Sequence, residues 1–265
     1  METLHNASLI MDDMEDNSLK RRGEDCCHIK YGLPLAINSG TTTYFLALNY
    51  ILSMEDKAKR AQLLEVAVRE MTNLHLGQNQ DIVWNRDIMG LDYKYKKEDY
   101  LTLCKHKTSG LMRIVISSCL VLSPLKYSED IKSKLEDLYN GIGILFQIVD
   151  DILNLEESSV AANKSARGED IREGNKTIIT IDALEHAESS KRDRLMTILK
   201  MKTLDQSLIE EAIGICEEAG SVERAKQFAR QMADDLTAMS QQVLKHAGVK
   251  ILMAQLIQFI YARKN

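Results

Sequence analysis

An acidic segment near the start of the chain contains residues suited to binding a divalent cation. Residues 8–23 read SLIMDDMEDNSLKRRG. If this segment is helical, Asp12 and Asp16 lie one turn apart on one face, and Asp13 lies about 100° round the axis. Magnesium suits such carboxylates best, because it binds through one or two of them, keeps several waters and takes its other oxygens from a substrate phosphate. The segment therefore predicts a magnesium site for a phosphorylated substrate.

Two basic residues, Arg21 and Arg22, follow this acidic cluster. Their guanidinium groups would supply fixed hydrogen-bond donors for phosphate oxygens. Acids and bases at this spacing are also typical of an ordinary solvated helix, so the segment alone leaves both interpretations open.

A second pair of adjacent aspartates, Asp150 and Asp151, stands inside the apolar run FQIVDDILNL of residues 146–155. Asn154 follows Asp150 by one helical turn. Two adjacent carboxylates among Phe, Ile, Val and Leu are costly unless a cation neutralises them. Two such pairs facing each other across a pocket would hold a diphosphate through bridging metal ions, which favours the metal-binding interpretation.

Composition predicts one helical domain that spans residues 1–265. The chain has two prolines, thirteen glycines and few aromatic residues, and no Pro/Gly/Ser-rich linker divides it. Such a composition favours helix almost throughout. A net charge of −5 and a pI near 5.8 argue against a nucleic-acid partner.

The cysteines and the hydropathy pattern predict a cytoplasmic protein. Five cysteines, two of them adjacent at Cys26 and Cys27, have no metal-ligand spacing and indicate reduced thiols. No segment approaches 18 consecutive apolar residues, so no transmembrane segment is expected.

The elements that must position the acidic motifs are long helices. We expect the first helix to be under way at Leu4, and Ser128, Asp205 and Ser221 to cap later helices, with Gly220 as a C-cap. The other expected helices are residues 35–54, 57–83, 98–122, 128–155, 177–201, 205–218 and 221–262.

Residues 156–176 form the one long stretch without clear periodicity. Because loops of this length are usually functional or disordered, and this one begins directly after the second aspartate pair, we expect a flexible lid. A solvated surface loop is the alternative. The lid would contain the charged residues Lys164, Arg167, Asp170, Arg172 and Lys176.

The order of these motifs resembles the trans-isoprenyl diphosphate synthase family, most of all its geranylgeranyl diphosphate synthases of eukaryotic type. The similar segments are residues 4–23, Gly77-Gln78 with Asp81, Lys107-Thr108, residues 146–154 and residues 163–174. The resemblance implies an all-α isoprenoid synthase helical bundle around a deep central cavity. The two aspartate motifs would face each other across that cavity and clamp an allylic diphosphate through two or three Mg²⁺ ions.

The resemblance also implies roles for individual residues. The metal ligands would be Asp12, Asp13, Asp16, Asp150 and Asp151, which with Lys107 form the catalytic set. The substrate-binding residues would be Arg21, Arg22, Lys107, Thr108, Gln147, Lys164 and Lys176, with Arg22 on the diphosphate of isopentenyl diphosphate. The floor that sets product length would be Ala7, Ser8, Leu74 and His75, although a core position is as plausible for His75. The small Ala7 and Ser8 would admit a chain longer than fifteen carbons.

The activity that the resemblance implies is a prenyltransferase reaction in a homodimer or larger homo-oligomer. Farnesyl diphosphate would be ionised and attacked by isopentenyl diphosphate, giving geranylgeranyl diphosphate. Two alternatives stay open: a terpene synthase that ionises an allylic diphosphate without condensation, and a catalytically weak regulatory subunit of a prenyl diphosphate synthase.

Three departures from the family pattern, together with the expected absence of its basic N-terminal segment, support those alternatives. Val149, Leu76 and Asn175 each stand where relatives have a cationic residue. Lys176 would substitute for the last of these by a shift of one residue.

Overall fold

The fold is built almost entirely of helices, as predicted. The computed structural model describes residues 1–86, 88, 94–156 and 167–263. The helices are α1 (Glu2–Glu15), α2 (Cys27–Tyr31), α3 (Leu33–Leu52), α4 (Lys57–Asn85), α5 (Lys97–Lys107), α6 (Ser109–Leu122), α7 (Glu129–Leu155), α8 (Glu169–Glu173), α9 (Ile178–His186), α10 (Ser189–Met201), α11 (Gln206–Glu218), α12 (Ser221–Val243) and α13 (Ala247–Ala262). Two short strands, β1 (Lys20–Arg21) and β2 (Glu24–Asp25), pair antiparallel.

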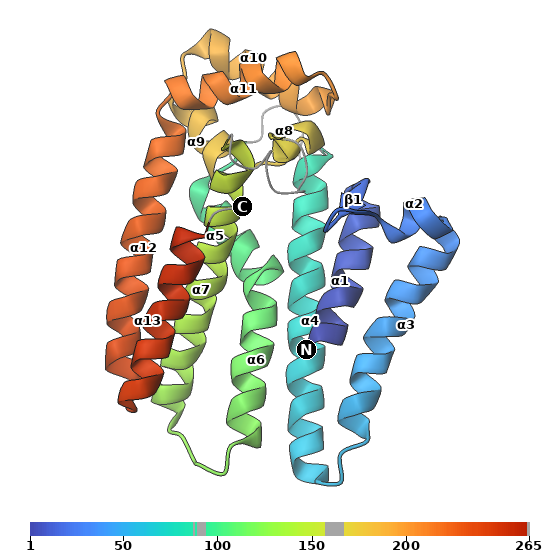
Figure 1. Ribbon diagram of the computed structural model, residues 1–265, viewed down its shortest axis with the longest axis vertical. Coiled ribbons are helices and arrows are strands. Elements are labelled where there is room, and N and C mark those ends of the chain that lie inside the picture. The colour runs from blue at the N-terminus through green and yellow to red at the C-terminus, as the bar shows by residue number, and fades with distance from the viewer. Residues whose placement is uncertain (87, 89–93, 157–166, 264–265) are drawn as a thin grey trace.

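The long helices run side by side, and the short helices α8 to α11 lie across one end of them (Figure 1). The helix α7 packs against α5, α6, α12 and α13. On the other side of α4, α1 packs against α3. No helix among the described residues combines the length and apolar character needed to cross a membrane.

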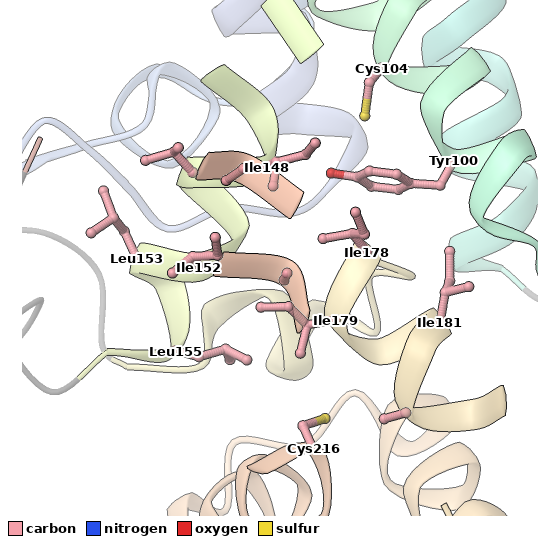
Figure 2. Packing of buried hydrophobic residues seen from close by; sticks show 14 of the residues in the cluster. Tyr100, Cys104, Ile148, Ile152, Leu153, Leu155, Ile178, Ile179, Ile181 and Cys216 are labelled. Carbon is pink, nitrogen blue, oxygen red and sulfur yellow. The ribbon is translucent and has the colours of Figure 1, made fainter. Parts of the chain in front are cut away.

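The core forms along α7 because its apolar residues recur at helical spacing. Leu138, Ile142, Leu145 and Ile148 lie three or four residues apart and are almost fully buried. Figure 2 shows how this core continues at the end of α7, where Ile148 packs near Tyr100 of α5 and the isoleucines that begin α9. The second aspartate pair therefore lies at the edge of the main apolar cluster.

A tight hairpin replaces the helical continuation of the first acidic segment. The helix α1 ends at Glu15, and β1 pairs with β2 so that Arg21 lies opposite Glu24. The turn residues Arg22 and Gly23 have φ angles of 53° and 83°. Positive φ at both positions is the requirement of a type I′ turn, which Gly satisfies without strain. Arg21 and Arg22 thus lie on a strand and a turn, outside the helix.

Several predicted helix boundaries are confirmed by their caps. The Ser128 hydroxyl accepts the Ile131 amide at 3.4 Å, and Asp205 accepts the Ser207 amide at 2.9 Å. Gly220 has φ of 71° just beyond α11, as a C-terminal glycine should.

Other predicted boundaries are wrong because these helix breaks contain no Pro, and the glycines near two of them, Gly110 and Gly248, lie inside the helices that follow. The expected helix over 98–122 breaks at Thr108, that over 177–201 breaks between α9 and α10, and that over 221–262 breaks between α12 and α13. Ser221 is the buried first residue of α12, and its predecessor Gly220 is the N-cap.

Candidate active site

The first acidic motif is held at the end of α1 by an arginine from the hairpin. Arg21 donates from Nε to Oδ1 of Asp13 at 2.8 Å, and from Nη2 to the same oxygen at 2.5 Å. Its Nη2 also lies 3.3 Å from Oδ2 of Asp12. Asp13 is buried, so the guanidinium group supplies the positive charge that a buried carboxylate requires.

Lys107 joins the first motif to two further helices. Its Nζ lies 2.6 Å from Oδ2 of Asp81 on α4 and 3.2 Å from Oδ1 of Asp12 on α1. Burial acts to lower the pKa of Lys107, but the carboxylates of Asp81, Asp12 and Asp16 outweigh it and raise that pKa well above its ordinary value. Lys107 is therefore a fixed cation beside the acidic cluster.

The close approach of α4 to the end of α5 depends on Gly77. A Cβ atom at this position would lie 2.5 Å from the backbone nitrogen of Lys107. Only glycine fits there without displacing Lys107, which explains why a glycine precedes Asp81 by one helical turn.

Two carboxylic acids next to this cluster hold their protons unusually tightly. Burial, and then the charge of Asp12, raises the pKa of Asp16 to about 8. Burial, and then the charge of Glu169, raises the pKa of Glu173 to about 7. Glu173 belongs to α8 and accepts a hydrogen bond of 3.3 Å from the Ser18 hydroxyl. Negative charge therefore exceeds the positive charge that Arg21 and Lys107 provide, as expected of a site for divalent cations.

The two aspartates of the second motif point to different environments. Asp151 is 3% exposed, and its carboxylate accepts hydrogen bonds from Tyr100 Oη at 2.6 Å, Gln147 Nε2 at 3.0 Å and the Ile178 amide at 3.3 Å. Burial raises the pKa of Asp151 to about 7, although the hydrogen bonds from Tyr100 and Gln147 oppose the rise. Asp151 is thus a buried, fixed carboxyl group.

Asp150 is exposed and pairs with a residue from the C-terminal end of the described chain. Arg263 donates from Nη2 to Oδ1 of Asp150 at 2.8 Å and to the carbonyl oxygen of Phe146 at 3.1 Å. Its guanidinium carbon lies 4.0 Å from the centre of the Phe146 ring. Of the second pair, Asp150 is the aspartate that a metal ion can reach from solvent.

Thr108 and Gln147, two of the predicted substrate-binding residues, are in direct contact. The Thr108 hydroxyl donates to Oε1 of Gln147 at 2.8 Å, and Gln147 in turn donates to Asp151. This chain of hydrogen bonds connects the break between α5 and α6 to the second motif. The break at Thr108 therefore has a function: it turns two adjacent residues, Lys107 and Thr108, toward different partners.

Side-chain amides stabilise residues 170–175, which include most of α8 and the turn after it. Asn154 Oδ1 accepts the Asp170 amide at 3.1 Å. Asn175 donates to Oδ1 of Asp170 at 3.0 Å and to Oε2 of Glu173 at 3.2 Å, and accepts from Asn85 at 2.7 Å. Burial and the charge of Asp151 raise the pKa of Asp170 well above its ordinary value. Asn175 thus stabilises this turn without adding positive charge.

Of the predicted substrate-binding residues, Arg22 does not join this cluster in the structure. Arg22 is exposed at the tip of the hairpin. Lys176 is buried, with Nζ 5.6 Å from the centre of the Tyr95 ring. Lys164 lies outside the described residues.

The residues predicted to form the floor separate into two places. Ala7 is fully buried in α1, and Leu74 packs against a small cluster that contains Leu4. The Ser8 hydroxyl donates to its own helix, at the carbonyl oxygen of His5. His75 is exposed and lines a groove of about 430 Å³ between α3 and α4, so it is not a core histidine.

A cavity of about 640 Å³ opens beside the first motif. It is lined by Asp16 from that motif and by Glu173 and Asn175, but by neither aspartate of the second pair. Among the described residues, no three His, Cys, Asp or Glu side chains are grouped so that they would hold a metal ion by themselves. The carboxylates of Asp12, Asp16 and Asp150 nevertheless fit magnesium, because this ion needs only one or two carboxylates and completes its shell with water and phosphate.

Sequence reasoning missed two residues of this site. Tyr100 stands in a mixed helix with no motif around it, and Arg263 lies near the end of an apolar helix. No local signal identifies either residue, because each contacts an aspartate that is distant in the sequence. Tyr100 reaches Asp151 from a separate helix, and Arg263 is 113 residues from Asp150.

Comparison with known proteins identifies the family. A model described as polyprenyl synthetase matches residues 1–216. A geranylgeranyl pyrophosphate synthase of Eremothecium gossypii is 35% identical over 88% of this chain and 73% of its own length. One of Emericella nidulans is 33% identical over 84% of this chain and 52% of its own length. The chain thus spans between about half and three quarters of these curated relatives.

A solved structure supports the same conclusion. The crystal structure of geranylgeranyl pyrophosphate synthetase from Pyrococcus horikoshii Ot3 matches with a TM-score of 0.84 and 27% identity, over 99% of this chain and 77% of that chain. The fold and the ordered motifs agree with the family model, and the chain belongs to the polyprenyl synthetase family, a family of prenyltransferases.

Proposed function

We propose that the protein condenses an allylic diphosphate, preferably farnesyl diphosphate, with isopentenyl diphosphate to form geranylgeranyl diphosphate. The observation that carries this proposal is the contact of Lys107 with both Asp12 and Asp81, beside the half-buried Asp16. Curated relatives that are 33% to 35% identical to this chain are geranylgeranyl pyrophosphate synthases, which also supports the proposal.

The chain's own residues would stabilise the leaving group. Ionisation of an allylic diphosphate separates charge, so fixed cations must lie where the diphosphate departs. Lys107 and Arg21 are such cations, and their carboxylate partners hold them in place before substrate arrives. Two or three magnesium ions, held by Asp12, Asp16 and Asp150, would neutralise further charge on the diphosphate.

The remaining steps of the reaction require an active site that excludes water and has room for a long product. The double bond of isopentenyl diphosphate attacks the allylic carbon and a proton is then lost, so water must be kept from the cation. Ala7 of α1 is small and fully buried, and a small residue at this position would favour a product longer than fifteen carbons.

A homodimer and a cytoplasmic location are part of this proposal. Apolar side chains of α3 and α4, including Phe45, Tyr50 and Val68, are more than half exposed, and Val68 lines the 430 Å³ groove. A second copy covering that face would bury them. All five cysteines are free, in keeping with a reducing compartment.

The direct test is to incubate the protein with magnesium and farnesyl diphosphate, with and without labelled isopentenyl diphosphate, and to identify the dephosphorylated products. A labelled twenty-carbon alcohol supports the proposal. A hydrocarbon formed without isopentenyl diphosphate would instead identify a terpene synthase, and folded protein without turnover would identify a regulatory subunit.

A pair of variants connects the activity to the acidic motif. Asp12→Asn removes a carboxylate that contacts Lys107, and we expect it to abolish turnover. Asp234→Asn changes an exposed aspartate of α12 and should leave turnover intact. Equal activity of the two variants would contradict the proposed site.

A further inference from the structure

The helix α6 contains a single charged residue, Arg113, and its side chain is buried. The sequence of α6 reads SGLMRIVISSCLVL, and Arg113 is 3% exposed. Its Nε donates to Oε2 of Glu70 on α4 at 2.6 Å, and its Nη1 donates to Oδ1 of Asn140 on α7 at 2.8 Å. Glu70 and Asn140 are buried as well. Arg113 therefore joins the two helices that pack on either side of α6 (Figure 1).

The same guanidinium group also contacts the end of α5. Its Nη1 donates to the carbonyl oxygen of Lys105 at 2.6 Å. In an unbroken helix this oxygen would accept the amide of Ser109, four residues later. The helix breaks at Thr108 instead, and the arginine supplies a donor to this oxygen at the break. Arg113 thus acts as a C-terminal cap of α5 that comes from the following helix.

One face of α4 connects Arg113 to the lysine beside the first acidic motif. The residues of this face recur at spacings of three or four, as one face of a helix requires, and are Glu70, Leu74, Gly77 and Asp81. Leu74 packs so closely on α6 that a Cβ atom added at Gly110 would lie 2.8 Å from it. Gly77 packs against the backbone of Lys107, and Asp81 binds Nζ of Lys107 at 2.6 Å.

A matching face of α7 lies against the same break between α5 and α6. It consists of Asn140, Gly143, Gln147 and Asp151. The Asn140 carbonyl oxygen accepts the Ser109 hydroxyl at 2.8 Å, and a Cβ atom added at Gly143 would lie 2.7 Å from the Cα of Ser109. Gln147 accepts from Thr108 and donates to Asp151. Both faces therefore begin at Arg113 and end at the acidic residues of the candidate site.

Stability alone gives a weak reason for a charged residue in this place. A buried ion pair costs desolvation, and well-packed apolar residues of similar volume often stabilise a fold as much or more. The polar contacts instead supply direction, because the guanidinium group is planar and its donors are fixed in a fork. Its acceptors come from α4, α5 and α7, so one arrangement of α6 against these three helices satisfies them all.

We propose that Arg113 is a positioning residue, which with Glu70 and Asn140 sets the break so that Lys107 and Thr108 face their partners in the active site. The inference rests on the proposed condensation reaction, in which Lys107 stabilises the diphosphate leaving group. Arg113 acts through Lys107 and Thr108. A shift of about 1 Å in such groups can cost about 10²-fold in rate, so the arrangement of the break matters for turnover.

The kinetic test uses the double variant Arg113→Met/Glu70→Leu, which removes both buried charges and keeps apolar volume. Under conditions where circular dichroism shows the variant to be fully folded, kcat should fall about tenfold or more. The KM values for both substrates should change less than about threefold, because the lost contacts act on the transition state. A purely structural role would leave the kcat of the folded variant unaltered.

Two single variants accompany this test. Arg113→Lys keeps a positive charge opposite Glu70, but one ammonium group lacks the fork that reaches three acceptors, so kcat should fall about threefold or more. The matched control is Arg69→Ala. Arg69 donates to the same Glu70 at 2.9 Å, is half-exposed and does not contact the break. Its loss should change kcat less than about twofold.

Amide hydrogen exchange provides a measurement that does not depend on turnover. In the double variant the amides of residues 105–113 should exchange about tenfold faster or more, because the break loses the arginine that holds it. The amides of α12 should exchange at an unchanged rate. The Arg69→Ala variant should exchange like the unaltered protein in both regions.

The outcomes separate this role from the proposed reaction. A folded double variant with unchanged kcat and unchanged exchange would overturn the positioning role and leave the condensation in place. If the unaltered protein does not condense the two substrates, the proposed reaction fails. Faster exchange in the double variant would then still show that Arg113 holds the break, and unchanged exchange would overturn that as well.

Discussion

Tyr100 on α5 donates a hydrogen bond of 2.6 Å from its hydroxyl group to Oδ2 of Asp151 on α7. Both residues are buried, and Figure 2 shows the Tyr100 ring packed among the isoleucines of α7 and α9. Burial and the neighbouring Asp151 charge raise the pKa of Tyr100 well above its ordinary value, so the phenol remains a donor. This pair fixes Asp151 in the core and leaves Asp150 at the surface.

Removal of the Tyr100 hydroxyl should make Asp151 harder to ionise. The hydrogen bond lowers the pKa of Asp151 against the effect of burial, so Tyr100→Phe raises that pKa and shifts the acid limb of the pH–rate profile upward. The buried carboxyl group also loses a donor, which should cost about 1.5–3 kcal/mol in the free energy of unfolding. Urea denaturation and a pH–rate profile measure the two effects.

Tyr139→Phe on α7 is the control for this variant. Tyr139 is half-buried, and within the described residues its hydroxyl group forms no hydrogen bond. A pH–rate profile that is the same in both variants would contradict a role for Tyr100 at Asp151.

Sequence reasoning found the acidic motifs because they are local. Asp12 and Asp150 each belong to a pair of adjacent aspartates inside an apolar segment. The energetic cost of placing two carboxylates among apolar side chains can be inferred from a few neighbouring residues. The caps at Ser128 and Asp205 were predictable for the same reason: a side-chain acceptor stands directly before a periodic apolar run.

What sequence reasoning missed depends on contacts between distant segments. The break at Thr108 has no Pro, and Gly110 lies inside the following helix α6. It is stabilised instead by Arg113, which donates to the Lys105 carbonyl oxygen at 2.6 Å, and by Ser109, which donates to the Asn140 carbonyl oxygen at 2.8 Å. Packing of α4, α6 and α7 brings these groups together, and no single stretch of sequence contains that information.

The stability of the metal-free protein should fall as pH rises. Asp16, Asp151 and Glu173 have folded-state pKa values of about 8, 7 and 7, well above those of unfolded carboxyl groups near 4. Their protonated forms therefore stabilise the fold fully below about pH 4, and this contribution is lost as pH rises through about 7 to 8. The melting temperature in a chelator should be lower near pH 8 than near pH 6.

Magnesium should counter this loss. Since the ion competes with protons for the same carboxylates, its stabilising effect on the melting temperature should grow between about pH 6 and pH 8. Asp16→Asn should reduce the pH dependence, whereas Asp234→Asn should not. A melting temperature that rises with pH in the chelator would contradict the assignment.

The buried pair of Arg113 and Glu70 should be sensitive to the loss of one partner. Arg113 donates from Nε to Oε2 of Glu70 at 2.6 Å and from Nη1 to Asn140 at 2.8 Å. Arg113→Met leaves the Glu70 carboxylate buried without its main partner, at a cost of about 3–5 kcal/mol in the free energy of unfolding. Urea denaturation measures this cost.

Two further variants test whether the burial of the Glu70 carboxylate causes this loss of stability. Arg113→Met with Glu70→Leu removes both charges and should recover a large part of the stability. Arg69→Ala removes a half-exposed partner of the same Glu70 and should cost less than about 1 kcal/mol. If Arg69→Ala and Arg113→Met lowered the free energy of unfolding equally, burial of the ion pair with Glu70 would not determine the cost.

Arg263 should compete with a metal ion for Asp150. The arginine is bound to Asp150 and stacked on Phe146, so it must release the carboxylate before a metal ion binds it. Arg263→Ala should therefore lower the magnesium concentration for half-maximal activity by about two- to fivefold, the range of a partly exposed ion pair. Arg263→Lys keeps the charge and is the control. A higher magnesium requirement in Arg263→Ala would show that the arginine assists binding.

The close packing of Gly77 against Lys107 can be tested by substituting Gly77 with alanine, with the same substitution at Gly214 as the control. Gly77→Ala places a Cβ atom 2.5 Å from the Lys107 backbone nitrogen, so α4 must move or Lys107 must leave Asp81. We expect a loss of about 1–3 kcal/mol in the free energy of unfolding and a marked loss of turnover. Gly214 lies inside α11 with no atom within 4 Å of an added Cβ. There the same substitution should stabilise the fold by about 0.5–1 kcal/mol, because alanine is the better helix former. If Gly77→Ala behaved like Gly214→Ala in both stability and activity, the close approach of α4 to Lys107 would not be needed to position the catalytic lysine.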